Sequence, residues 1–204
     1  MISSRNHFYW GSLALGFALA GPTLTADSIA DFGQWLARYE AAPMGDKTGL
    51  VAEGVRLAKR RQPAMRRLIA TQPHLALQRA VPRLAKLPEP VARHLEQHAE
   101  GLAEYTVTVA CGGPEHRTCK VERMLELNGQ RLTPRWLGRR AHLGSKSGLP
   151  VHGIVLGGQM AIADEPAREL SAAEKTALSL AANQTVLSLA GARRAFDSPA
   201  AAAA

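Results

Sequence analysis

The spacing of apolar residues changes near residue 104, and this change limits the fold of the 204-residue chain more than any other feature. Over 27–103, apolar residues recur every three or four positions, which is typical of helices with one buried face. Over 104–170 they alternate with polar or small residues, which is typical of strands. A helical spacing returns over 171–196. This order predicts an α+β protein with an N-terminal helical layer, a small β region and a C-terminal helix.

Prolines and glycines divide the helical region into several short helices. Ser28, Asp46 and Thr71 are the predicted N-caps of successive helices, because a short polar side chain can accept a hydrogen bond from the first turn. Pro63 either kinks the second helix or begins a new one. A further short helix is expected over 91–98. The apolar stripe of the first helix consists of Ile29, Phe32, Trp35, Leu36 and Tyr39.

The β region carries two strong turn signals. Asn128-Gly129 favours a type I′ hairpin, and Gly157-Gly158 predicts a second tight hairpin. Pro134 lies in a strand expected over 131–140, and a proline there favours an edge or bulged strand. About five short strands with such turns predict a small antiparallel barrel or a strongly bent sheet, of the size of an OB or SH3-like domain.

Cys111 and Cys119 flank the segment CGGPEHRTC, which is rich in turn residues and joins two of the expected strands. Cysteines that face each other on antiparallel strands fall within disulfide range, so one structural disulfide is predicted. The competing hypothesis is a redox or metal-binding pair. The residues favour it less, because the spacing is not that of CxxC and only His116 lies nearby. No metal and no other cofactor is expected.

The first 26 residues have the pattern of a secretory signal peptide. Arg5 is followed by an apolar run of about ten residues and then by Ala26, a small residue at the expected cleavage site. The run is too short to cross a bilayer, and no longer one follows it, so no stable membrane anchor is expected. We therefore expect a secreted or periplasmic protein. The alanine-rich tail over 197–204 is typical of a linker, which suggests that the chain is the leader module of a larger protein.

Lysine and arginine outnumber the acidic residues by 25 to 17, which gives a net charge of +8. A basic surface can attract nucleic acid, acidic polysaccharide or anionic lipid. Nucleic acid is the least expected of these for an exported chain, so we predict a protein partner or a downstream domain and leave the oligomeric state open. The alternative for the basic residues named next is a solvated stripe, and the alternative for Trp136 is a place in the core. The candidate partner-binding residues are Lys59, Arg60, Arg61, Arg66, Arg67 and Trp136.

The sequence contains no GxSxG, HExxH, P-loop or GxGxxG motif, so no catalytic residue is assigned. His94 and His98 would share one face of a helix, but two histidines alone do not make a zinc site. A small hydrolase with an unfamiliar site is an alternative. It requires that His142, His152 and Asp164 lie within about 4 Å of one another, as a base and the group that orients it must.

The chain contains GVRLAKRR from Gly54 through LIATQP from Leu68, then AVP from Ala80 and VHGIVLGGQMAI from Val151. These stretches resemble the N-terminal module of large secreted multidomain bacterial proteins, some of which carry metallopeptidase or adhesin-like domains. The resemblance covers roughly residues 50–170 and implies a non-catalytic leader or propeptide-like module. It assigns no functional residue.

The leading hypothesis is therefore a non-enzymatic secreted or periplasmic interaction or assembly module. The first alternative is a propeptide-like or inhibitory domain for a secreted metallopeptidase. The second alternative is the small hydrolase.

Overall fold

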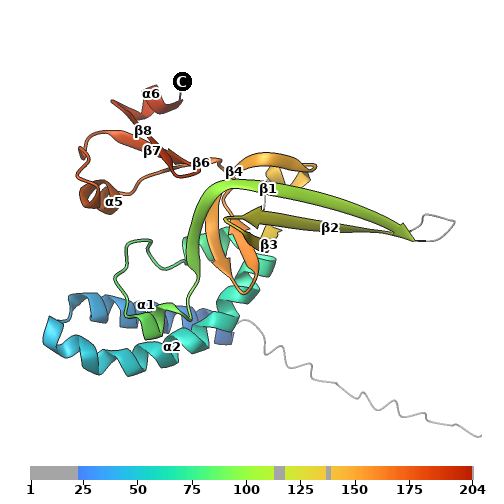
Figure 1. Cartoon of the computed structure of the whole chain (residues 1–204). Helices are drawn as coiled ribbons and strands as arrows, with labels where there is room; N and C mark the ends of the chain where they lie inside the picture. The colour runs from blue at the N-terminus through green and yellow to red at the C-terminus, as the bar shows by residue number, and fades with distance from the viewer. Residues whose placement is uncertain (1–22, 113–117, 137–138, 204) are drawn as a thin grey trace, which may run out of the picture.

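The computed structural model describes residues 23–112, 118–136 and 139–203. Three parts follow one another along the chain: a helical layer (residues 23–92), a closed barrel with a long two-stranded arm (97–162), and a small C-terminal unit (167–203) (Figure 1). The α+β fold class and the order of the first two parts are as predicted. Residues 1–22, which make up most of the predicted signal peptide, lie outside the described residues.

The helical layer consists of α1 (Thr23–Ala41) and α2 (Met44–Thr71), which pack against each other. The stripe predicted for the first helix is buried, and Trp35 is its most enclosed side chain. Trp35 lies over Gly54 of α2, where an added Cβ would be 2.2 Å from the indole ring. Pro63 lies inside α2, which continues on both sides of it, so a new helix does not begin there.

The structure corrects the three predicted helix caps. Ser28 lies inside α1, and Asp46 lies in the first turn of α2. Thr71 is the last residue of α2, where its hydroxyl donates to the carbonyl of Arg67 (2.8 Å), and the short helix α3 (Pro73–Gln78) follows. A capping side chain is a weak local signal, and α2 begins after Pro43 with no side-chain cap.

The barrel consists of five strands in the closed order β1-β2-β3-β5-β4. All neighbouring strands are antiparallel except β3 and β5, which run parallel and correct the prediction of a wholly antiparallel barrel. This connectivity is that of a five-stranded Greek-key barrel of the OB type. The strands are β1 (Gln97–Gly112), β2 (Thr118–Leu127), β3 (Gln130–Arg135), β4 (Lys146–Leu156) and β5 (Gln159–Ile162).

Both predicted hairpins are confirmed. Asn128 and Gly129 join β2 to β3 with φ of 50° and 76°, as a type I′ turn requires. Gly157 and Gly158 join β4 to β5 with φ of 59° and 74°. The strand expected over 131–140 is shorter, because β3 ends at Arg135 and a 3₁₀ turn, η1 (Arg139–His142), precedes β4.

The helix expected over 91–98 is a single turn, α4 (Glu89–Ala92). From Gln97 onward the chain pairs with β4 instead, and His98 faces Ile154 in this ladder. Long-range strand pairing therefore overrides the local helical spacing. His94 and His98 consequently do not share a helix face, which corrects that prediction; the Nε2 atom of His98 lies 2.7 Å from the carbonyl oxygen of Val81.

Beyond the barrel, β1 and β2 continue as a two-stranded ribbon, which we call the arm: residues 106–112 and 118–124 (Figure 1). Cys111 and Cys119 face each other near its tip and form a disulfide, as predicted. On the outer sides of the arm, the ladders with β4 and β3 have already ended at Tyr105 and Leu125.

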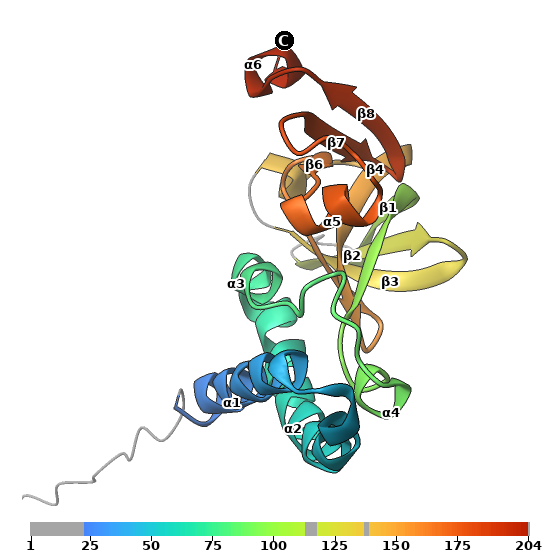
Figure 2. The same cartoon turned by 90° about the vertical axis from the view of Figure 1, so that its left-hand side faces the viewer.

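The helical layer lies at one end of the barrel and the C-terminal unit at the other (Figure 2). Met65 and Ile69 of α2 pack against Ile154 and Ala161 of the barrel. A buried ion pair adds to this contact, because Arg61 of α2 binds the carboxylate of Glu96, one residue before β1.

The helix predicted over 171–196 is correct only at its start. The capping box of Ser171 and Glu174 is confirmed and begins α5 (Ala172–Ala177). Ser179 then adopts a φ of 55°, and residues 185–196 form a hairpin. The tail predicted as a linker includes an exposed helical turn. The remaining elements are β6 (Ala167–Glu169), β7 (Thr185–Leu189), β8 (Ala192–Phe196) and α6 (Pro199–Ala203).

The error over 185–196 has a physical reason. Thr185 and Val186 are β-branched and favour a strand, and Gly191 with a φ of 89° supplies the turn. The alanines and leucines around them fit a helical spacing equally well. The unit is attached to the barrel through Glu100 of β1, which accepts hydrogen bonds from Arg168 (2.8 Å) and Ser188 (3.3 Å).

Candidate binding groove

The structure does not bring the predicted basic cluster together as one surface. Arg61 is 1% exposed and its charge is used inside the protein, so its prediction as a partner contact is wrong. Arg60 forms an ion pair with α1, and Arg66 lies over the β4–β5 turn. Lys59 and Arg67 are exposed. Helical geometry separates these residues, because consecutive positions point in different directions around the axis.

Trp136 belongs to the barrel core, which was the alternative stated for it. It is 8% exposed, and its ring meets Tyr105 edge to face at a centroid distance of 5.0 Å. The guanidinium of Arg140 lies over the same ring, 5.3 Å from its centroid. The indole Nε1 has no hydrogen-bond acceptor among the described residues. Trp136 therefore does not project as an anchor, although it lines the groove described below.

The histidines proposed for a hydrolase lie in different surroundings. His142 is exposed on η1, whereas His152 is partly buried beside the C-terminal unit. Burial lowers the pKa of His152, opposed in part by a hydrogen bond that its imidazole donates to the backbone of Glu165. Among the described residues, no hydrogen bond or ion pair joins any two of His142, His152 and Asp164. The hydrolase hypothesis gains no support from this arrangement.

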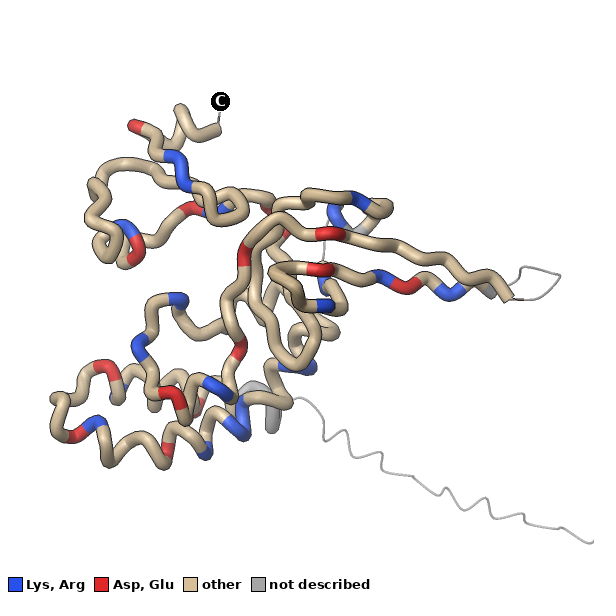
Figure 3. Tube along the Cα trace, viewed as in Figure 1, with Lys and Arg blue, Asp and Glu red and all other residues tan. Residues whose placement is uncertain are grey.

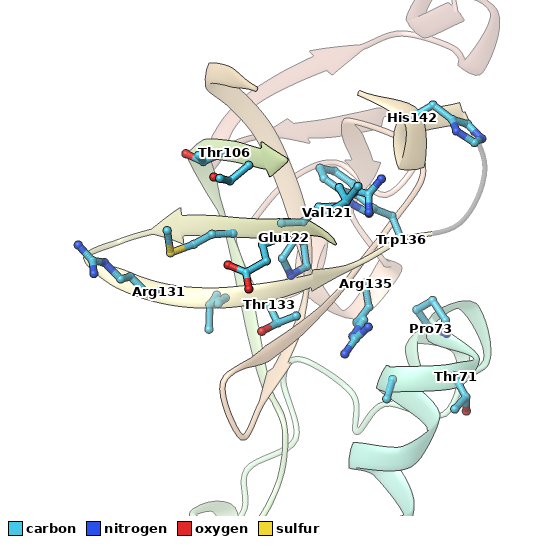
Figure 4. A pocket seen from close by; sticks show the side chains of 16 residues that line it. Thr71, Pro73, Thr106, Val121, Glu122, Arg131, Thr133, Arg135, Trp136 and His142 are labelled. Carbon is cyan, nitrogen blue, oxygen red and sulfur yellow. The ribbon is translucent and has the colours of Figure 1, made fainter. Parts of the chain in front are cut away.

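A groove of about 870 Å³ lies between the arm, β3 and the corner where α2 meets α3 (Figure 4). Residues 121–124 of β2 and 131–135 of β3, with Trp136 directly after β3, form its two long sides, and Thr106 and Thr108 of β1 line it as well. Thr71 and Pro73 contribute from the helical layer, and His142 from η1. The groove thus combines four regions that are distant in sequence: the α2–α3 corner, β1, the β2–β3 hairpin and η1.

The groove follows the open edge of β2 and part of one face of the arm, because Thr106 and Thr108 of β1, which lie opposite Met124 and Glu122, also line it. Successive side chains of a strand point to opposite faces. Nevertheless, every residue from 121 to 124 and from 131 to 136 lines the groove. Only the edge of a strand lies next to side chains from both of its faces. The groove is therefore the opening that forms where β2 and β3 separate.

The edge of β2 presents backbone groups to this opening. On β1, the N–H of Val107 donates to Ser145 Oγ (2.9 Å), so the backbone groups of Val107 point away from β2. Val107 faces Arg123, and this pair is therefore a non-hydrogen-bonded pair of the ladder. Val109 and Val121 form the next pair of the same kind. The N–H and C=O groups of Val121 and Arg123 consequently point away from β1, into the groove.

The disulfide agrees with this assignment. Cys111 and Cys119 form the following pair of the same kind, and their Cα atoms are 4.1 Å apart. Non-hydrogen-bonded pairs have the shorter of the two antiparallel spacings, about 4.5 Å against about 5.5 Å. Within the described parts of the chain, no strand pairs with residues 118–124 on the groove side.

Pro134 explains why β3 does not close the groove. The ladder between β2 and β3 ends where Leu125 faces Leu132. Its next hydrogen-bonded pair would place Arg123 opposite Pro134, which has no N–H to donate. From Thr133 onward, β3 pairs only with β5, which lies along its other edge. The β2 edge can therefore pair with another strand, and the β3 edge facing it lacks a donor.

The groove is basic. Arg123, Arg131 and Arg135 line it, and its one acidic lining residue is Glu122. The carboxylate of Glu122 lies 2.6 Å from Nζ of Lys120, so its charge is balanced by a neighbour on the same strand. The local field therefore favours a ligand with negative charge.

Sequence reasoning named Trp136 and His142 but missed the groove itself. Pro134 was the available signal, because a proline inside a predicted strand marks a place where pairing stops. The separation of β2 from β3 depends on pairing between distant segments, which no local sequence pattern predicts. Comparison of the chain with protein-family models, with curated proteins and with solved structures finds no match. None of the described helices is long and apolar enough to cross a membrane.

Proposed function

We propose that this chain is a non-enzymatic interaction module that works outside the cytoplasm and binds an extended, acidic segment of a partner protein. The proposal rests on the β2 edge, where the backbone N–H and C=O groups of Val121 and Arg123 point into a basic groove. A segment bound there would add a strand to β2, a recurrent mode of peptide recognition in which backbone hydrogen bonds provide affinity.

The two faces of the groove suggest the chemistry of the segment. Leu132 and Trp136 line it on the side of the barrel core, whereas Arg131 and Arg135 alternate with them on the opposite face. A strand bound in the groove would also point successive side chains to opposite faces. Apolar side chains would meet the core side, and acidic side chains would meet the arginines.

An extracytoplasmic location is supported by two features. The N-terminal pattern is that of a signal peptide. The Cys111–Cys119 disulfide belongs to an oxidising compartment, since cytosolic thiols are normally kept reduced. The proposal therefore places the partner segment in the periplasm or outside the cell.

The test uses the full chain and a synthetic peptide of alternating glutamate and valine, N-methylated at every second residue so that it cannot stack on itself. Its binding is measured by fluorescence anisotropy. The variant Val121→Pro removes an N–H that points into the groove and leaves the β1–β2 hydrogen bonds intact. We expect it to weaken binding by about tenfold, the effect of one lost hydrogen bond with added crowding.

The matched control is Val109→Pro, because Val109 faces Val121 across the arm and points its N–H to the opposite side. This variant should bind the peptide as the native chain does. A lysine–valine peptide should bind at least tenfold more weakly than the acidic one. Equal loss of binding in the two proline variants, or equal binding of the two peptides, would show that the groove does not act in this way.

A further inference from the structure

The other edge of the arm is open as well, and its composition is unusual. Residues 106–112 of β1 read TVTVACG and contain no charged side chain, whereas the opposite strand carries charges of both signs (Figure 3). Exposed strand edges are normally protected by charge, proline or a bulge, because they are templates for pairing with another chain. Along residues 106–112, the structure shows protection only at Val107, whose backbone N–H and C=O groups both hydrogen-bond the hydroxyl of Ser145.

The unpaired groups of this edge can be assigned. Val109 and Cys111 have the same orientation as Val107, so their N–H and C=O groups point away from β2. No hydrogen bond within the described residues uses them. Val109 is also 57% exposed, and Val121 beside it is 44% exposed, so the arm presents apolar surface next to the open edge.

We propose that this edge pairs antiparallel with the same edge of a second copy of the chain, about a two-fold axis at Ala110. In this register Val109 of each copy faces Cys111 of the other. The four hydrogen bonds that result use the two free residues of each copy and leave the Ser145 contact in place. An edge that is its own complement in this way fits the isologous interface of a two-fold dimer.

The uncharged composition of this edge, with its self-complementary backbone groups, fits a second copy as the occupant. Each chain carries a net charge of +8, so two copies repel at long range. Two arms can meet along the β1 edge without placing like charges opposite each other, because residues 106–112 contain no charged side chain. The groove lies along the other edge of the arm, so the dimer would keep both grooves open. The inference is thus independent of what the groove binds.

Sedimentation equilibrium of the full chain tests the pairing. Val109→Pro removes one N–H from each copy, hence two of the four hydrogen bonds, and we expect the dimer to dissociate about thirtyfold more readily. Val121→Pro should dimerise as the native chain does, and Val109→Thr, which keeps the N–H, should do the same. A native chain that stays monomeric up to about 1 mM would overturn the proposal, as would equal effects of the two proline variants.

A cross-link tests the register. At the two-fold axis the Cα atoms of Ala110 would be about 4.5 Å apart, within the range of a disulfide. Ala110→Cys should therefore form a covalent dimer on mild oxidation, with peptide mapping to confirm that Cys111 still pairs with Cys119. Lys120→Cys, which faces Ala110 across the arm, is the control. Dimers that form equally well from both variants would contradict this register.

Discussion

Replacing Arg61 by alanine should destabilise the protein severely. The Arg61 side chain is 2% exposed and that of Glu96 is 0% exposed. Glu96 also accepts a hydrogen bond from the N–H of Val81 (2.8 Å), and Arg61 donates to the carbonyl of Arg79 (2.8 Å). The pair thus joins α2, the loop after α3 and the start of the barrel at one point.

The cost follows from what the substitution leaves behind. Removing one partner of a buried ion pair leaves an uncompensated charge, which costs about 3–5 kcal/mol of folding free energy. The guanidinium also lies over the ring of Phe32, 5.4 Å from its centroid, so some packing is lost as well. Replacing both members, as in Arg61→Met with Glu96→Leu, should cost less than Arg61→Ala alone, because no buried charge remains.

Urea denaturation followed by circular dichroism measures these changes. Arg67→Ala is the matched control, because Arg67 lies on the same helix and is exposed, and it should change stability by less than about 0.5 kcal/mol. If Arg61→Ala costs no more than this control, or if the double variant costs the sum of the two single ones, the importance given to the buried pair is wrong.

Two further predictions concern Glu96 and the glycines of α2. Burial alone would raise the pKa of Glu96, but the hydrogen bond and charge of Arg61 outweigh it and lower that pKa. The stabilisation is therefore complete above the ordinary value near 4.3 and is lost as the pH falls through the lower folded-state pKa. Glu96→Gln should remove this part of the acid destabilisation in a denaturation series from pH 7 to about 3, and an unchanged slope would contradict the assignment. Gly54→Ala should lower the melting temperature through contact with Trp35, at a cost of about 1–3 kcal/mol. Gly49→Ala in the same helix has no atom within 4 Å of the added Cβ and should stabilise by about 0.5–1 kcal/mol; effects of the same sign at both glycines would refute the packing described for Trp35.

Local patterns predicted those parts of the fold that local geometry decides. Asn128-Gly129 specified its turn, because that dipeptide accepts positive φ at both positions. Cys111 and Cys119 specified a cross-strand disulfide through their spacing and flanking strands. The stripe containing Trp35 identified the buried face of α1 for the same kind of reason.

The remaining errors arise where distant segments compete with local preference. Gln97 and His98 leave a helical pattern because β4 pairs with them. Residues 185–196 form strands although alanine and leucine suit a helix. The groove could not be predicted at all, since it depends on Arg123 and Pro134 failing to pair across two strands.

The covalent link near the end of the arm has a consequence for the timing of activity. In a two-stranded ribbon without further neighbours, the ends separate easily, because few contacts hold them. The Cys111–Cys119 bond holds the two strands of the arm together near its tip. The strands are therefore already ordered before another chain binds. Before the disulfide forms, the ends of the two strands would fray, and each binding event would first have to order them. If the chain is exported as proposed, its arm would become ordered for strand pairing only after it reaches the oxidising compartment.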